Sequence, residues 1–268
     1  MGDISETNPK NKILIAGPCV IQDYNTCLYI AKEVKRCSEK YNFSPIFKAS
    51  FDKANRTSVN GFRGIGIEEG MEILYSIKTN VEIPIITDVH ESTQVDYVSR
   101  FSDYLQIPAF LCRQSDLIEK CAKSGLPTLI KKGQFLSPES CRFIEEKFNS
   151  FSSGQNLMIG ERGNSFGYND LIVDVTSIQR LKNSCNKSNI ILDCTHSLQI
   201  PNTSEGRTKG KSGLIETMVK FGAVCDVDGL FIETHPNPKE SPSDSENMLE
   251  LSNLDMILGK ARKIYDCL

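Results

Sequence analysis

The 268-residue sequence predicts a closed (β/α)8 barrel that forms a single domain over residues 1–268. Three observations lead to this fold class. Short apolar segments alternate with amphipathic helical segments along the chain. The apolar segments are nearly continuous, as expected for parallel strands that are covered on both faces. Eight such units in about 250 residues match the usual size of this barrel. An open, doubly wound sheet is the alternative, but no Gly-x-Gly-x-x-Gly motif follows the first strand.

Eight segments have the composition of short buried strands. They cover residues 13–20, 45–50, 84–89, 104–109, 127–132, 157–162, 190–195 and 229–235. The last one is followed by Pro236 and Pro238, which cannot continue a strand ladder. The sequence places one of these strands in each of the eight units.

Helical patterns fill the gaps between the strands. Apolar residues at helical spacing mark helices at 27–34, 67–77 and 117–122, and Gly125 ends the third. Ser137-Pro138-Glu139 begins another helix with a cap and a proline in its first turn. Further helices are expected at 170–181, 214–221 and 251–267. Residues 1–10 are expected to form a short arm, and the polar stretch 200–213 a mobile loop over the site.

The composition excludes several classes of protein. The net charge of −3 argues against a nucleic-acid binder, and no apolar run approaches the roughly 20 residues of a membrane span. The polar first residues do not resemble a secretory signal. The ten cysteines contain no Cys-x-x-Cys pair, so reduced thiols in a cytoplasmic protein are expected.

Basic residues gather at the predicted strand ends of this slightly acidic chain. Active sites of such barrels lie at the carboxyl ends of the strands. The basic residues there are Lys48, Lys53, Arg56, Arg113, Lys131, Lys132 and Arg162. Each one alone is more simply a solvated surface charge. Together they predict a site for substrates that carry phosphate or carboxylate groups.

Four potential metal ligands also lie at or beyond strand ends: Cys19, His196, Glu233 and Asp244. A thiolate, an imidazole and two carboxylates suit Zn, Fe(II) or Mn, and do not suit Mg or Ca. Asp193 is expected to support a neighbouring ligand, and His90 and His235 to lie around the site. The alternative is that a lone cysteine or histidine at such a position is only a buried structural residue.

Motifs along nearly the whole chain carry a resemblance to a known family. They are Ala16-Gly-Pro-Cys19, Phe47-Lys-Ala-Ser-Phe-Asp-Lys-Ala-Asn-Arg56, Ile86-Thr-Asp-Val-His-Glu91, Gln106-Ile-Pro-Ala-Phe-Leu-Cys-Arg-Gln114, Ile130-Lys-Lys-Gly-Gln-Phe135, Glu161-Arg-Gly-Asn-Ser-Phe-Gly-Tyr-Asn169, Asp193-Cys-Thr-His-Ser-Leu-Gln199 and Phe231-Ile-Glu-Thr-His-Pro-Asn-Pro238. In this combination the chain resembles the 3-deoxy-D-manno-octulosonate 8-phosphate (Kdo-8-phosphate) synthases.

The resemblance implies a reaction and an assembly. Phosphoenolpyruvate condenses with D-arabinose 5-phosphate and water to give Kdo-8-phosphate and inorganic phosphate, for lipopolysaccharide synthesis. It implies a (β/α)8 barrel, a homotetramer and no organic cofactor. Because the metal-independent branch carries Asn where this chain has Cys19, the resemblance is to the metal-dependent branch, with one divalent ion.

The resemblance also assigns roles to individual residues. Lys48, Lys53, Lys132 and Arg162 resemble the phosphoenolpyruvate cradle, with Gln134 close by. Asn55, Arg56 and Thr57 resemble the pentose-phosphate clamp, and Asp88 a residue near the sugar. Gln106 and Gln199 are further substrate-binding candidates, and Phe110 and Arg113 lie in a segment near a subunit boundary. The catalytic candidates are His196, Asp244, Cys19 and Lys132.

Three rival functions are weighed against this one. A 3-deoxy-D-arabino-heptulosonate 7-phosphate synthase would use erythrose 4-phosphate and typically carries Lys-Pro-Arg-Thr where this chain has Lys53-Ala-Asn-Arg56. A metallohydrolase barrel commonly has a His-x-His pair at its first strand, which here ends Gly17-Pro18-Cys19. A non-catalytic binding protein on the same scaffold would not need the complete set of cationic and ligand-type residues.

Overall fold

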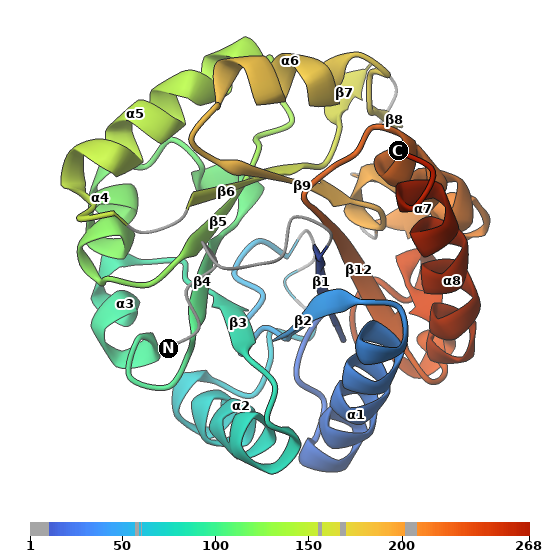
Figure 1. Ribbon diagram of the computed structural model, residues 1–268. Helices are drawn as coiled ribbons and strands as arrows, with labels where there is room; N and C mark the ends of the chain where they lie inside the picture. The colour runs from blue at the N-terminus through green and yellow to red at the C-terminus, as the bar shows by residue number, and fades with distance from the viewer. Residues whose placement is uncertain (1–10, 57–58, 60, 155–156, 167–169, 202–207) are drawn as a thin grey trace.

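A closed barrel of parallel strands forms the centre of the molecule (Figure 1). The computed structural model describes residues 11–56, 59, 61–154, 157–166, 170–201 and 208–268. The strands pair in the order β1-β2-β3-β4-β5-β6-β9-β12, and β12 pairs with β1 to close the ring. Helices surround the ring on the outside. The predicted fold class is therefore confirmed.

The eight predicted strands are all present. They are β1 (Lys12–Gly17), β2 (Phe43–Lys48), β3 (Ile85–Asp88), β4 (Tyr104–Ile107), β5 (Thr128–Lys131), β6 (Leu157–Glu161), β9 (Asn189–Asp193) and β12 (Gly229–His235). The outer helices are α1 (Tyr24–Lys40), α2 (Ile67–Val81), α3 (Ser92–Val98), α4 (Ser115–Lys123), α5 (Arg142–Phe151), α6 (Ser177–Ser184), α7 (Ile215–Val224) and α8 (Leu254–Tyr265). All strands except β12 end earlier than predicted, because the chain leaves the ladder there to build the loops of the site.

Alternation along the strands separates two apolar layers. Successive side chains of a strand point to opposite faces, so every second residue faces the barrel axis. The inner layer is a compact cluster of Ile13, Ile15, Ile46, Ile86, Leu129, Met158, Ile191 and Phe231. Every barrel strand other than β4 contributes to it, and Tyr104 of β4 packs against it. This plug fills the barrel interior and forms a floor beneath the strand ends.

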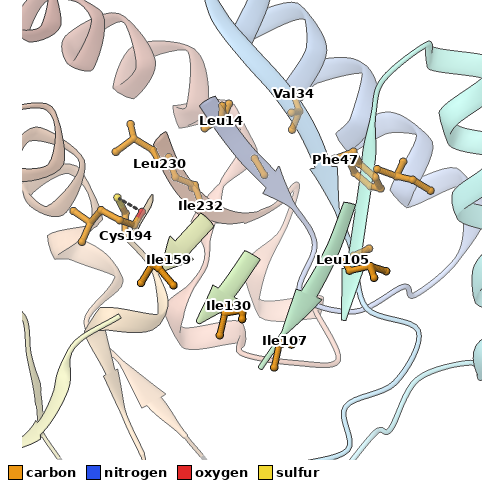
Figure 2. Close-up of a cluster of buried hydrophobic side chains, with 14 of the residues drawn as sticks. Leu14, Val34, Phe47, Leu105, Ile107, Ile130, Ile159, Cys194, Leu230 and Ile232 are labelled. Carbon is orange, nitrogen blue, oxygen red and sulfur yellow. Dashed lines mark hydrogen bonds between the residues drawn. The ribbon is translucent and has the colours of Figure 1, made fainter. Parts of the chain in front are cut away.

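The outer layer packs the strands against the helices. Figure 2 shows part of it, with Leu14, Phe47, Leu105 and Ile130 among the labelled strand residues and Val34 from α1. These residues are almost completely buried. Their burial supplies most of the hydrophobic stabilisation of the fold, at roughly 25 cal/mol per Å² of apolar surface.

Polar groups occupy the next inward-facing positions above the apolar floor. Two residues beyond the inner apolar layer, the strands carry Lys48, Asp88, Gln106, Lys131, Asp193 and Glu233. At the same level β1 and β6 carry Gly17 and Gly160. A Cβ atom on Gly160 would lie 2.9 Å from Lys131 Cδ, so the glycine leaves space for that side chain. Inward-facing positions recur every second residue along a strand, so the charged layer lies directly above the apolar layer of the barrel interior.

The sequence prediction was wrong in the segment after β6. Residues 170–181 were expected to be one helix, but Asp170–Ile172 is strand β8, paired antiparallel with β7 (Asn164–Phe166). The helix α6 begins only at Ser177. Asp174 supplies the turn before it, since its carboxylate accepts a hydrogen bond from Thr176 N at 2.8 Å. The branched residues after Asp170 prefer the extended pairing over a helix.

Two other expected segments lie wholly or partly outside the described residues. Residues 1–10 and 202–207 are among them, so the expected arm and most of the expected mobile loop are not described. The ends of that loop pair as a two-stranded ribbon of β10 (Gln199–Ile200) and β11 (Lys209–Gly210). Among the described helices, none has the length and apolar character that a membrane crossing would need.

Candidate active site

A cavity of about 190 Å³ opens at the carboxyl ends of the barrel strands. Its walls are mainly polar, and the lining side chains include Lys48, Lys53, Asn55, Arg56, Asp88, His90, Gln106, Phe110, Lys131, Gln134, Arg162, Asp193, His196, Gln199 and Asp244. Most of the substrate-binding candidates named from the sequence are in this set. Thr57 lies outside the described residues. Arg113 and Lys132 do not line the cavity.

Lys48 and Lys53 meet on the β2 side of the cavity. Their ammonium groups both donate to Ser50 Oγ, each at 3.0 Å. Lys48 is fully buried and also lies 3.4 Å from Glu233 Oε1. Burial alone would lower the pKa of Lys53, but the acidic groups around it, the carboxylates of Asp88, Glu233 and Asp244 among them, outweigh burial and raise it. Both ammonium groups thus lie together at the β2 side of the cavity.

Asp88 is the counter-charge for these lysines. Its carboxylate accepts hydrogen bonds from Ser50 and Gln106 and lies 3.7 Å from Lys48 Nζ. Burial would raise the pKa of Asp88, but Lys48 and Lys53 hold it below its ordinary range. Because Gln106 donates through Nε2, its Oε1 is left buried without a hydrogen-bond partner among the described residues. That oxygen is an acceptor available to a ligand hydroxyl.

Lys131 and Arg162 provide positive charge on the opposite strands. Lys131 Nζ donates to Asp193 Oδ2 at 2.6 Å and stands 3.1 Å from the centre of the Phe231 ring. Burial lowers the pKa of Lys131 to about 8, although the Asp193 carboxylate opposes this shift. Arg162 donates to Gln199 Oε1 at 2.6 Å. Both side chains line the cavity.

Lys131 was left out of the residue roles assigned from the sequence, where Lys132 was placed in the cradle. The structure places Lys131 in the cavity and turns Lys132 away from it. Strand alternation is the signal that could have separated them, since Leu129 faces the barrel axis and Lys131 therefore does too. Asp193 is the other residue whose role is larger than expected, because it contacts both Lys131 and His196.

The four predicted metal ligands converge beside this cavity. Donor atoms of Cys19, Glu233 and Asp244 all lie within 4.8 Å of one another. Cys19 Sγ is 3.0 Å from Asp244 Oδ2, and His196 Nε2 is 3.3 Å from Glu233 Oε1. Residues from the ends of β1, β9 and β12 and from the loop after β12 thus form one cluster.

The chemistry of this cluster fits a divalent ion with soft or intermediate ligand preference. Glu233 Oε2 is buried and has no hydrogen-bond partner in the described part of the chain. Burial raises the pKa of the Cys19 thiol, and the carboxylates of Asp244 and Glu233 raise it further. A cation between these groups would offset that repulsion and stabilise the thiolate. Sulfur, nitrogen and carboxylate oxygen are the donors that Zn and Fe(II) accept together.

Neighbouring groups orient the candidate ligands. Asp193 Oδ2 lies 2.7 Å from His196 Nδ1, which turns Nε2 of the ring toward Glu233. Ser243 Oγ lies 2.9 Å from Cys19 Sγ and donates to Asp244 Oδ2 at 3.1 Å. Asp244 itself has the left-handed backbone conformation, with φ of 48°. A carboxylate–histidine pair of this kind is the usual support of a metal-binding imidazole.

Comparisons with known proteins agree with the motifs and the fold. Residues 3–265 match the model of the DAHP synthetase I family. A 2-dehydro-3-deoxyphosphooctonate aldolase of Campylobacter jejuni subsp. doylei is 44% identical over 255 residues, covering 91% of this chain and 94% of the relative. A protein of the same name from Rickettsia canadensis is 42% identical over 256 residues, covering 95% of this chain and 91% of the relative.

Proposed function

The chain belongs to the DAHP synthetase I family, and from that premise we propose that it acts as a 2-dehydro-3-deoxyphosphooctonate aldolase, that is, a Kdo-8-phosphate synthase. It condenses phosphoenolpyruvate with D-arabinose 5-phosphate and water, and it releases Kdo-8-phosphate and inorganic phosphate for lipopolysaccharide biosynthesis. Identity above 40% over nearly the full length of the Campylobacter and Rickettsia enzymes supports this assignment.

The observation that carries the proposal is the cationic cavity at the strand ends. Lys48, Lys53, Lys131, Arg56 and Arg162 line one small polar space. Two substrates that each carry a phosphate group repel one another, and buried cations offset that repulsion. The cavity therefore suits two phosphorylated substrates held side by side, where reacting carbons need to be within about 3–3.5 Å.

We assign the phosphoenolpyruvate cradle to Lys48, Lys53, Lys131 and Arg162, with Gln134 beside them. This assignment takes Lys131 in place of Lys132 because Lys131 lines the cavity. Asn55 and Arg56, followed by Thr57, are proposed to bind the phosphate of arabinose 5-phosphate. Asp88 and Gln106 face the same space and are suited to the sugar hydroxyls. Gln199 links the proposed cradle to the cluster of metal-ligand candidates, since it accepts a hydrogen bond from Arg162 and donates one to Asp244 at 2.9 Å.

The reaction needs one carbon–carbon bond and one addition of water. The enol carbon of phosphoenolpyruvate attacks the aldehyde carbon of the pentose, and water adds at the neighbouring carbon, from which phosphate leaves with its bridging oxygen. The cradle holds the enol against the aldehyde and excludes competing water. We propose that Asp244, which lines the cavity, moves a proton at the attacking water.

We propose that the enzyme depends on one divalent metal ion held by Cys19, His196, Glu233 and Asp244. The unpartnered oxygen of Glu233 and the mutual repulsion around Cys19 support this ligand set. When bound, such an ion supplies Lewis-acid polarisation or lowers the pKa of a water molecule. No organic cofactor is needed for a condensation in which phosphoenolpyruvate provides the nucleophilic carbon.

A homotetramer in the cytoplasm is proposed for the assembly. Phe110 lines the mouth of the cavity and is 55% exposed, and Phe135 on the neighbouring loop is 58% exposed. Exposed aromatic side chains beside a site favour burial against a partner subunit. Sedimentation of the purified protein would test this state, and a monomer at micromolar concentration would count against it.

The experiment that tests the function is phosphate release from phosphoenolpyruvate. Release is expected with arabinose 5-phosphate, with a much lower kcat/KM for erythrose 4-phosphate, and little release with no aldehyde. A preference for erythrose 4-phosphate would transfer the chain to the rival synthase activity of the same family. Treatment with a chelator is expected to abolish turnover, and added Zn, Fe(II) or Mn to restore it. Turnover unchanged by exhaustive chelation would remove the metal from the mechanism.

A further inference from the structure

Lys132 is a fully buried lysine that lies outside the cavity although it follows Lys131 directly. Burying an unpaired ammonium group is strongly unfavourable, so its surroundings must compensate the charge. Its Nζ has three oxygen neighbours: it donates to Asn164 Oδ1 at 2.6 Å and to Leu136 O at 3.4 Å, and it forms an ion pair with Glu161 Oε1 at 3.3 Å. The ammonium group is therefore bound and its charge compensated within the protein.

The three oxygen neighbours come from two different segments of the chain. Leu136 belongs to the loop after β5, whereas Glu161 and Asn164 lie at the end of β6 and directly beyond it. Further bonds join the same segments around the buried charge. Asn164 Nδ2 donates to Leu136 O at 2.7 Å, and Ser165 N donates to Gln134 O at 2.9 Å. Lys132 thus occupies the centre of a junction between these two loops.

This junction carries residues of the cavity wall on both sides. Lys131 and Gln134 belong to the β5 side, and Arg162 lies between Glu161 and Gly163 on the β6 side. Gly163 N donates to Glu161 Oε1 at 2.7 Å, so the carboxylate that pairs with Lys132 also fixes the backbone next to Arg162. A shift of either loop at this junction would therefore also move Lys131, Gln134 or Arg162, which line the cavity.

We propose that Lys132 is a positioning residue, which clamps the loop after β5 to the segment after β6 and so places Lys131, Gln134 and Arg162 for anion binding. The inference rests on the proposed function, because it takes the phosphoenolpyruvate cradle as the site that is positioned. Its physical basis is the buried pair with Glu161, in which both side chains are fully buried. Removing one member leaves an uncompensated charge, which the two loops can solvate only by separating.

The first test compares the KM and the Kd for phosphoenolpyruvate in Lys132→Met with those in Lys131→Met, which removes a lysine that lines the cavity. Misplacement of a binding group by about 1 Å can cost on the order of 10²-fold in rate. Lys132→Met is therefore expected to raise the KM and the calorimetric Kd for phosphoenolpyruvate by roughly 10- to 100-fold. The KM for arabinose 5-phosphate is expected to change less than about threefold, because Asn55 and Arg56 lie after β2, outside this junction. A purely structural lysine would instead lower the melting temperature and leave both KM values unchanged.

A double-mutant cycle with Glu161 separates positioning from direct contact. If Lys132 acts through the junction, Lys132→Met and Glu161→Leu disturb the same element, and the double variant is no worse for phosphoenolpyruvate than the worse single variant. Multiplicative effects on Kd would overturn the proposal and return Lys132 to the cradle.

Two further variants keep the test decisive. If Lys132→Met does not fold, Asn164→Ala removes one acceptor of the same ammonium group and is expected to raise the KM for phosphoenolpyruvate severalfold. Unchanged kinetics of a folded Asn164→Ala would contradict the inference. Lys120→Met, which breaks an exposed pair with Asp96, is the matched control and should behave as wild type. If wild-type protein binds phosphoenolpyruvate in the calorimeter but shows no condensation, the proposed function fails while the Kd comparison still tests the clamp.

Discussion

At the scale of single residues, we propose that Lys131 is one of the cations that bind the phosphate of phosphoenolpyruvate. It lines the cavity, and Asp193 engages one of its donors. Lys131→Met keeps the length and apolar body of the side chain but removes the charge. We expect kcat/KM for phosphoenolpyruvate to fall by about 10²- to 10³-fold, as for the loss of one preorganised charge-stabilising donor. Steady-state phosphate release measures this, and a loss below tenfold would contradict the assigned role.

The pH dependence of binding provides a separate prediction for the same side chain. The pKa of Lys131 is about 8, since burial and the nearby Lys48 and Arg162 disfavour its charge while Asp193 favours it. The binding form is protonated, so affinity should be nearly complete well below pH 8, reach about half of its maximum near pH 8 and fall further above it. At pH 9.5 we expect binding of phosphoenolpyruvate to be about thirtyfold weaker. Lys131→Arg should move this decline to higher pH in calorimetric titrations, and an unchanged profile would exclude Lys131 as its origin.

Cys19 offers a prediction on metal content that does not depend on activity. It provides the only thiol of the proposed ligand set, and thiolate ligands contribute strongly to Zn and Fe(II) affinity. Cys19→Ala is expected to retain less than about a tenth of the metal found in wild-type protein after dialysis, measured by atomic emission. Cys225→Ala, at a partly exposed cysteine that directly follows the C-terminus of α7, is the control and should keep its metal. Equal metal content in Cys19→Ala would place the ion elsewhere.

At the scale of the elements, alternation along the strands builds both the floor and the wall of the site. In β2, Ile46 packs in the inner core and Lys48 two residues later binds Ser50 at the cavity. The same step separates Phe231 from Glu233 in β12. A shift of one residue in either strand would exchange the apolar and polar faces.

Gly17 and Gly160 lie in the polar layer above the apolar floor, and we expect different results when each one is replaced by alanine. A Cβ on Gly17 would lie 2.1 Å from Lys48 O, which belongs to a paired strand and cannot move away. Gly17→Ala is therefore expected to destabilise the protein by at least about 3 kcal/mol or to prevent folding. A Cβ on Gly160 would meet only side-chain carbons and Lys131 backbone at longer range. Gly160→Ala should fold and bind phosphoenolpyruvate more weakly.

Urea unfolding and calorimetric titration of the two variants separate these effects. A stable Gly17→Ala protein with normal binding would show that β1 and β2 can move apart, against the packing described for them. Normal binding by Gly160→Ala would show that Lys131 does not need the space above Gly160.

The strands and most of the side chains that line the cavity could be predicted from the sequence, and the reason is physical. Short continuous apolar runs such as the one before Asp193 alternate with helical segments, which favours parallel strands covered on both faces, and in a barrel the carboxyl ends of such strands meet at one rim. Residues in the loops were less predictable. The helix expected over 170–181 failed because pairing with residues 164–166 decided its first part, and such pairing is a long-range property. Lys131 and Lys132 were confused because motif matching ignores which face of β5 each one occupies.

At the scale of the whole molecule, buried thiols make the free energy of unfolding depend on pH in the alkaline range. Burial raises the pKa of Cys27 and of Cys121 to about 12. The folded state therefore keeps these protons between about pH 9 and 12, where the unfolded chain loses them, so stability falls as pH rises. By pH 10 each thiol should remove roughly 1 to 2 kcal/mol relative to pH 7.5.

Urea unfolding at pH 7.5 and pH 10 tests this coupling in wild-type protein and in the double variant Cys27→Ala/Cys121→Ala. The double variant should be less stable at pH 7.5 because of its lost packing, but it should lose roughly 3 kcal/mol less on going to pH 10. Parallel losses in the two proteins would mean that other groups govern alkaline unfolding.

The adjacency of Lys131 and Lys132 has a consequence for how this chain can tolerate changes in length. One ammonium group lines the cavity and its neighbour is enclosed by Asn164, Glu161 and Leu136, and only the parity of β5 distinguishes them. A deletion of one residue before Lys131 would move Lys132 into the position that lines the cavity and Lys131 into the position of Ile130, while leaving the local composition nearly the same. The strand β5 in this chain and its relatives should therefore tolerate substitutions far more readily than a single insertion or deletion. Engineered insertions or deletions in β5 should be lost from a selection for growth that requires this enzyme.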